Sequence, residues 1–155
     1  MKRWPFAKAS LAIYFSLLLS SFIFSCTSKV EPFSVFKAYE EAVQYAKKEN
    51  KKILIIFGAD WCPDCKALNQ LLVAPEVKSF VQEKFLIFQV DVGKFDTNLD
   101  FNQKFGNPIE NGIPALVIID PKNQESILAS TKGGEFSSAS QMRAENVLSY
   151  LKQFQ

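Results

Sequence analysis

Two cysteines lie three positions apart in the segment FGADWCPDCK, residues 57–66, with Pro63 and Asp64 between them and Trp61 in front. Cysteines at this spacing can ligate a metal, form an inert structural disulfide, or exchange electrons with other thiols. A third cysteine, Cys26, lies far upstream, at the end of an apolar run. The rest of the sequence must decide among these chemistries.

The composition disfavours the first two readings. A closed zinc site needs four ligands, usually Cys, His or carboxylate side chains. The chain has no histidine and three cysteines in all, so the pair supplies two soft ligands, and we expect no metal. An inert disulfide is also disfavoured, because closing so short a loop removes little entropy from the unfolded chain.

Redox exchange fits the local pattern better. The unbroken apolar run KILIIFG, residues 52–58, is typical of a strand buried on both faces, and helical spacing begins near Cys62. A helix N-terminus carries partial positive charge and unpaired N–H groups, which stabilise a thiolate. We therefore expect Cys62 to be an exposed nucleophile and Cys65, one helical turn on, to be the thiol that resolves the mixed disulfide.

The elements that must position this pair follow from hydrophobic periodicity and turn residues. Strands are predicted over residues 52–58, 85–92, 115–120 and 125–130, and helices over residues 34–49, 62–72, 74–85, 96–106 and 138–154. Asp60 is placed to cap the helix that carries the cysteines, with a catalytic role as the equal alternative. Helices and strands that alternate and then end in a hairpin indicate an α/β fold, with one mixed sheet flanked by helices and a single core.

Three segments together resemble a known family. WCPDC after a buried strand, followed about fifty residues later by GIPA, resembles the thioredoxin superfamily over residues 34–154. FGADWCPDCKAL, VDVGKFDTNLDF and GIPALVIID resemble its exported bacterial members. The resemblance implies a three-layer α/β/α fold with a central mixed sheet of about four strands.

The resemblance also implies roles for residues near the cysteines. Pro114 would follow a cis bond and lie against the active-site disulfide, and the backbone of Ile113 would pair with an extended substrate peptide. Trp61 would lie beside the nucleophile and shape substrate contact, although it could also be a packed core aromatic. Pro63 and Asp64 would shape the site from between the cysteines.

Two departures from the family pattern bear on the chemistry. Typical thioredoxins bury an aspartate, paired with a lysine, that helps the second cysteine lose its proton, and those positions correspond to Ile56 and Ile87 here. Asp64 or water must then take that proton from Cys65. Asp64 also adds negative charge near Cys62, which should raise the pKa of that thiol. The helix dipole acts in the opposite direction, and we expect a pair more reducing than strong periplasmic oxidants.

The N-terminus indicates export. A basic start and an apolar run of residues 9–25 without charge are typical of a signal peptide, which we assign to residues 1–25. Ile23, Phe24, Ser25 and Cys26 resemble a bacterial lipobox, so residues 26–33 would be a lipidated N-terminus and tether, and residues 34–155 the thioredoxin-like domain. An ordinary cleaved signal and an uncleaved anchor are the alternatives, and each places the domain outside the cytoplasm.

These features predict an extracytoplasmic thiol–disulfide oxidoreductase of the reductase or isomerase kind, lipid-anchored in the cell envelope or periplasm. Its partners would be protein thiols and disulfides, an electron-donor redox protein and a membrane. Its only redox group would be the Cys62–Cys65 disulfide, because the chain carries no flavin or nucleotide motif. A net charge of +2 gives no sign of nucleic-acid binding. The alternative is a binding or assembly lipoprotein of the same fold, for example in cytochrome c maturation, with redox activity secondary.

Overall fold

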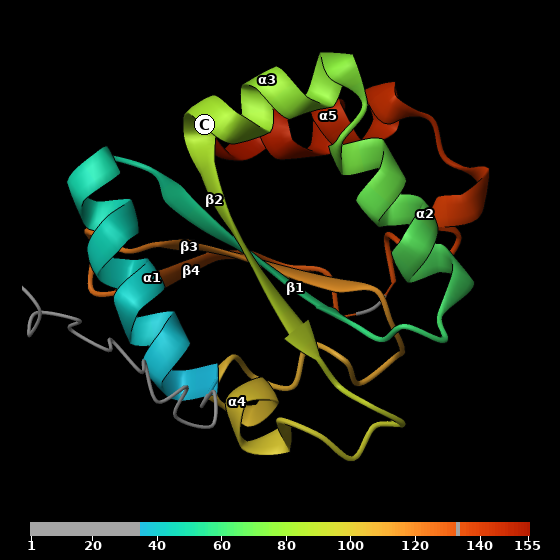
Figure 1. Cartoon of the computed structure of the whole chain (residues 1–155), viewed down its shortest axis with the longest axis horizontal. Coiled ribbons are helices and arrows are strands. Elements are labelled where there is room, and N and C mark those ends of the chain that lie inside the picture. Colours follow the sequence, from blue (N-terminus) through green and yellow to red (C-terminus); the bar gives the residue numbers. More distant parts are fainter. Residues whose placement is uncertain (1–34, 133) are drawn as a thin grey trace, which may run out of the picture. The chain divides into compact units, whose positions relative to one another are not determined.

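The computed structural model describes residues 35–132 and 134–155, so the predicted signal, the lipobox at Cys26 and the tether lie outside the described residues. The described chain alternates helices and strands as the sequence predicts (Figure 1). In chain order the elements are α1 (Val35–Glu49), β1 (Lys52–Gly58), α2 (Pro63–Leu72), α3 (Pro75–Lys84), β2 (Phe85–Asp91), α4 (Leu99–Lys104), β3 (Ala115–Asp120), β4 (Ser126–Ser130), the 3-10 helix η1 (Ala139–Gln141), α5 (Ala144–Leu151) and the 3-10 helix η2 (Lys152–Phe154).

The four strands form one mixed sheet in the order β2-β1-β3-β4. β1 runs parallel to β2 and antiparallel to β3, and β3 and β4 form an antiparallel pair. Phe57, near the end of β1, pairs with Val90 on one side and with Ala115, the first residue of β3, on the other. The C-terminal end of β1 therefore lies beside the N-terminal end of β3.

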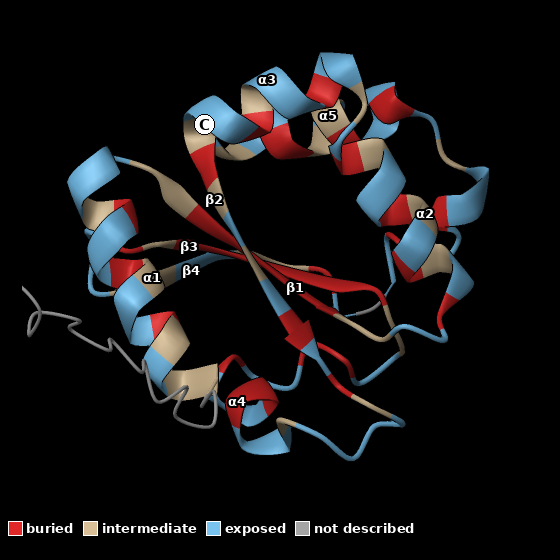
Figure 2. Ribbon diagram, in the orientation of Figure 1, coloured by how far each residue is buried: buried red, intermediate tan, exposed pale blue. Residues whose placement is uncertain are grey.

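The sheet has a hydrophobic core on each face, so the prediction of a single core was wrong. Successive side chains of a strand point to opposite faces, and a strand buried on both faces must feed two cores. Ile53, Ile55 and Phe57 pack with α1 and α4, whereas Leu54 and Ile56 pack with α2, α3 and α5. Figure 2 shows the buried stripe of each helix turned toward the sheet, which confirms the three-layer α/β/α arrangement.

Two predicted helices are shorter than their sequence pattern. The segment expected to be helical over residues 138–154 is interrupted at Met142 and Arg143, which are both extended, between η1 and α5. The helix expected over residues 96–106 begins only at Leu99, after Asn98 in a left-handed conformation, because the residues before it form a loop. No helix among the described residues has the length and apolar character needed to cross a membrane.

Candidate active site

Cys62 lies where the chain passes from β1 into α2, and it is the N-cap of α2. Its backbone is extended, its side-chain sulfur accepts a hydrogen bond from the Cys65 N–H at 3.0 Å, and Pro63 occupies the first helical turn. Proline is favoured there because its missing N–H would have no helical partner. The helix cap is thus Cys62 itself, and the expectation that Asp60 caps α2 was wrong.

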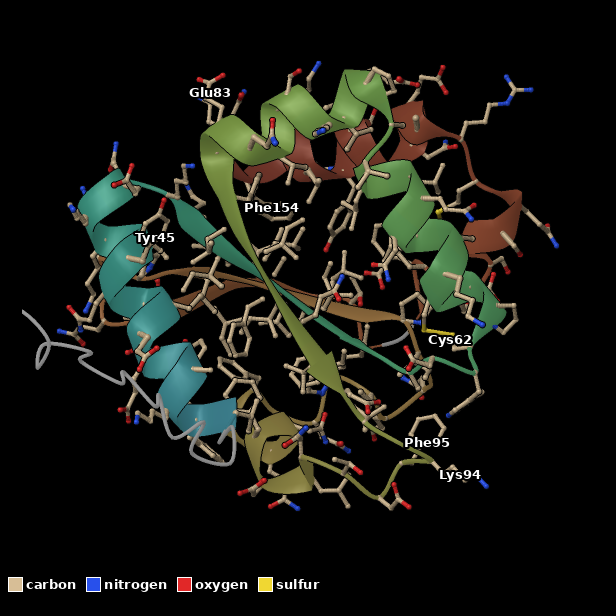
Figure 3. All side chains as sticks on the ribbon, in the orientation of Figure 1. Tyr45, Cys62, Glu83, Lys94, Phe95 and Phe154 are labelled. Carbon is tan, nitrogen blue, oxygen red and sulfur yellow. A yellow bond between two sulfur atoms is a disulfide. The ribbon has the colours of Figure 1, made fainter. Side chains whose placement is uncertain are left out.

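Cys62 and Cys65 form a disulfide, with their Cα atoms 5.3 Å apart. Figure 3 shows it at the N-terminal end of α2. In this oxidised pair the Cys65 N–H is aimed at the Cys62 sulfur. A backbone N–H at a helix N-terminus stabilises a thiolate at that position. This contact gives a physical reason for Cys62, rather than Cys65, to be the attacking sulfur.

Both cysteines are buried, so the expectation of an exposed Cys62 was wrong. Cys62 is 3% exposed and Cys65 is 6% exposed. The cap geometry turns the Cys62 sulfur back onto the first turn of α2, and the carbonyl oxygen of Ile113 lies 3.7 Å from it. Trp61, the residue before Cys62, is by contrast exposed.

The segment that faces the disulfide comes from the start of β3. The Ile113–Pro114 peptide bond is cis, as the resemblance implied, and Pro114 is buried. Ala115 follows at once and pairs with Phe57 of β1. The sheet register thereby brings two segments about fifty residues apart in the sequence to one site.

Trp61 is held at the surface by the loop between β2 and α4. It is 54% exposed, its indole N–H donates to the carbonyl of Gly93 at 2.7 Å, and its ring lies 6.0 Å from that of Phe95. A side chain at Gly93 would be strained, because this residue has φ +56° and an added Cβ would lie 2.6 Å from the Thr97 hydroxyl oxygen. Trp61 is a surface residue beside the disulfide and not a core aromatic. The sequence analysis missed Phe95.

Asp64 makes its contacts with the C-terminal part of the chain. Its Oδ1 accepts hydrogen bonds from the backbone N–H of Ser140 at 2.9 Å and from the Ser140 hydroxyl at 2.7 Å. The backbone hydrogen bond and then the hydroxyl hydrogen bond lower the pKa of Asp64. A carboxylate with a lowered pKa is a weak base, so Asp64 is a poor candidate for taking the Cys65 proton. No motif around Ser140 signals this contact.

A cavity of about 250 Å³ lies behind Cys65, between α2 and β2. It has a buried floor that includes Ile56, Cys65 and Val90, and its other lining residues include exposed polar side chains. The full lining is Ile56, Gly58, Ala59, Asp60, Cys65, Lys66, Asn69, Gln89, Val90 and Asp91. Gly58 keeps this point uncrowded, since a Cβ there would lie 3.2 Å from the Cys65 sulfur.

Two amide side chains meet in the lining of this cavity. The Gln89 amide nitrogen donates to the Asn69 side-chain oxygen at 3.1 Å. The residue opposite Ile56 on β2 is Gln89, and Ile87 lies two pairs further away, opposite Leu54. Gln89 of β2 therefore places a polar side chain in the lining of the cavity. The sequence comparison had assigned the family's lysine position to Ile87 and did not predict this.

Comparisons with known proteins bear on this site. The family model described as "Thioredoxin-like" matches residues 35–121, which include both cysteines and Pro114. The crystal structure of a disulphide isomerase from Xylella fastidiosa Temecula1 superposes with a TM-score of 0.73 at 32% identity, covering 79% of this chain and 92% of that one. The reduced C-terminal domain of Neisseria meningitidis DsbD superposes with a TM-score of 0.58 at 25% identity, covering 77% of this chain and 96% of that domain.

Another similarity is to a larger protein. Anterior gradient protein 3 of Xenopus tropicalis is 29% identical over 86 residues, which are 55% of this chain and 48% of that protein. The chain thus spans about half the length of this relative.

Proposed function

The chain belongs to the thioredoxin-like family, and on that premise we propose that it is a thiol–disulfide oxidoreductase that reduces or isomerises disulfides of proteins outside the cytoplasm. The observation that supports this most is the environment of the Cys62 sulfur. It receives the Cys65 N–H at the start of α2 and faces the carbonyl of Ile113, next to the cis bond at Pro114. The similar Xylella structure is titled as a disulphide isomerase, which fits this chemistry.

The proposed cycle transfers two electrons. The Cys62 thiolate attacks a substrate disulfide, so a bond forms between Cys62 and one substrate sulfur and the other substrate sulfur leaves as a thiolate. Cys65 then loses its proton and attacks Cys62, which releases the second substrate thiolate. The substrate is reduced and the Cys62–Cys65 pair is oxidised. A separate electron-donor redox protein must reduce the pair again.

We expect the pair to work as a reductant. Asp64 lies two residues after Cys62 in the chain, and hydrogen bonds from Ser140 hold it in its ionised form. Its negative charge opposes formation of the Cys62 thiolate. The Cys65 N–H acts in the opposite direction. We therefore predict a reduction potential well below the value of about −120 mV found for a strong oxidant. Equilibration with glutathione buffers of known ratio measures it, and a potential near −120 mV would overturn the reductant assignment.

Export and lipid attachment complete the proposal. They rest on the sequence of the first 26 residues: a basic start, an uncharged apolar run and a lipobox-like end at Cys26. Mass spectrometry of the mature protein tests this directly. A diacylglyceryl-modified N-terminal Cys26 is expected, and a chain that still begins at Met1 would contradict it. Replacing Cys26 with serine should abolish the modification and leave the Cys62–Cys65 chemistry intact.

Reduction of insulin by the purified protein, with dithiothreitol as electron donor, tests the activity. The wild-type protein should accelerate insulin precipitation, and Cys62→Ser should reduce the rate to that of dithiothreitol alone. Cys26→Ser is the matched control, because it also removes one thiol and should keep full activity. A wild-type rate equal to that of dithiothreitol alone would favour the alternative, a docking or assembly protein that uses the exposed Trp61 surface.

A further inference from the structure

We propose that water in the cavity behind Cys65, held by the Asn69 and Gln89 side chains, accepts the Cys65 proton when this thiol resolves a mixed disulfide. The proposal rests on the proposed oxidoreductase function. It assigns Asn69 and Gln89 as positioning residues, which act on Cys65 through solvent and do not touch the reacting sulfurs of the substrate.

The cavity has the size and lining that bound water requires. Each water molecule takes roughly 30 Å³ of liquid volume, so a space of about 250 Å³ holds several of them. A retained water also needs polar partners. The Asn69–Gln89 pair supplies donors and acceptors in the same lining as Cys65, and both amides are exposed enough to connect that water with bulk solvent.

The other groups near Cys65 are less suited to receive its proton. Ile56 cannot accept a proton, and the Asp64 carboxylate is bound by Ser140. The titratable and charged side chains that line the cavity are Asp60 from the turn after β1, Lys66 from α2 and Asp91 from the end of β2. All three are exposed to solvent, and the proposed route does not need them, because the cavity water passes the proton on to bulk solvent.

The step balances in protons and electrons. The Cys65 S–H bond breaks and its proton passes to a cavity water, which passes a proton to bulk solvent. The Cys65 thiolate then forms the bond to Cys62 as the bond between Cys62 and the substrate sulfur breaks, and the substrate leaves as a thiolate. Removing an amide that positions the water should slow this second step and leave the first attack by Cys62 unchanged.

Stopped-flow reaction with DTNB, the aromatic disulfide 5,5′-dithiobis(2-nitrobenzoate), separates the two steps. The reduced full chain carrying Cys26→Ser releases one thionitrobenzoate anion in a bimolecular phase when Cys62 attacks. It releases a second in a concentration-independent phase when Cys65 resolves the adduct. The test variants are Asn69→Leu and Gln89→Leu, with Asn69→Gln as the conservative replacement. Gln103→Leu is the matched control, since it removes an exposed amide from α4, on the opposite face of the sheet.

We expect the second phase to slow by about tenfold in both leucine variants, less than the range of about 10² to 10⁴ that a positioned acid or base side chain contributes, because water can still enter the cavity. Its pH profile should move to higher pH, and Asn69→Gln should recover most of the rate. An unchanged second phase with an unchanged profile in both leucine variants would overturn the proposal, as would equal slowing by Gln103→Leu. If the parent chain released no second anion at all, the oxidoreductase assignment itself would fall, and this inference with it.

Discussion

Thr131 connects the start of β3, where the cis bond lies, to the strand beside it. Thr131 is only 4% exposed, and its hydroxyl oxygen accepts a hydrogen bond from the backbone N–H of Leu116 at 2.8 Å. The Thr131 N–H in turn donates to the Leu116 carbonyl at 3.0 Å. Leu116 is two residues after Pro114, so this reciprocal pair fixes the strand that carries the active-site loop.

Replacing Thr131 with valine keeps the shape of the side chain and removes the acceptor. The buried Leu116 N–H would then have no partner, and leaving a buried donor unsatisfied costs about 1–3 kcal/mol. No cavity is created, because valine and threonine have nearly the same volume. We therefore expect Thr131→Val to lower the free energy of unfolding by about 2 kcal/mol.

Urea denaturation followed by circular dichroism measures this loss. With a slope of about 1–3 kcal/mol per molar urea for a small domain, the midpoint should fall by roughly 1 M with the slope unchanged. Thr131→Ser retains the acceptor and should lose much less. A valine variant as stable as the wild type, or one no less stable than the serine variant, would refute the reasoning, because the hydroxyl would then contribute nothing to the backbone of β3.

Three further predictions follow from the site. Gly93→Ala should cost at least about 1 kcal/mol, because it puts a side chain in a left-handed, crowded position, and should weaken the near-ultraviolet circular dichroism of Trp61 as its hydrogen bond is lost. Hydrogen bonds from Ser140 lower the pKa of Asp64, so the ionised carboxylate stabilises the folded chain. In urea titrations, the stability advantage of the wild type over Asp64→Asn should be constant above about pH 4 and should decline at more acidic pH. An advantage that grows in acid would contradict this prediction. Ile56→Asp should lower the free energy of unfolding by about 2–5 kcal/mol. It also places a carboxyl group with a raised pKa beside the cavity, and this group should change the pH profile of the second DTNB phase. An unaltered profile would contradict this prediction.

The sequence predicted the elements that hold the cysteines because their signals are local. An unbroken apolar run marks β1, a proline in the first turn marks α2, and their junction places Cys62. The start of β3 was likewise predicted from the isoleucine–proline pair and the apolar run that follows it in the sequence. The mixed sheet flanked by helices followed from alternation and a final hairpin, both of which depend on short stretches of chain, whereas the strand order was not predicted.

What the sequence did not predict depends on contacts between distant segments. The Asp64–Ser140 hydrogen bonds join positions 76 residues apart, and neither residue has a motif that announces the other. The cavity at Gln89 arises from the register of β1 with β2, which periodicity alone does not specify. The burial of Cys62 depends on where the Ile113 loop comes to lie, so an exposed nucleophile was the natural but wrong expectation.

The most direct test of the central claim, that Cys62 attacks and Cys65 resolves, is to trap the intermediate between them. Cys65→Ala should accumulate mixed disulfides with cellular proteins, and peptide mapping should place every adduct on Cys62. The same variant carrying Cys62→Ser should yield none, while Cys26→Ser should leave the adducts unchanged. Absence of adducts in Cys65→Ala, or adducts that persist when Cys62 is also replaced, would contradict the account.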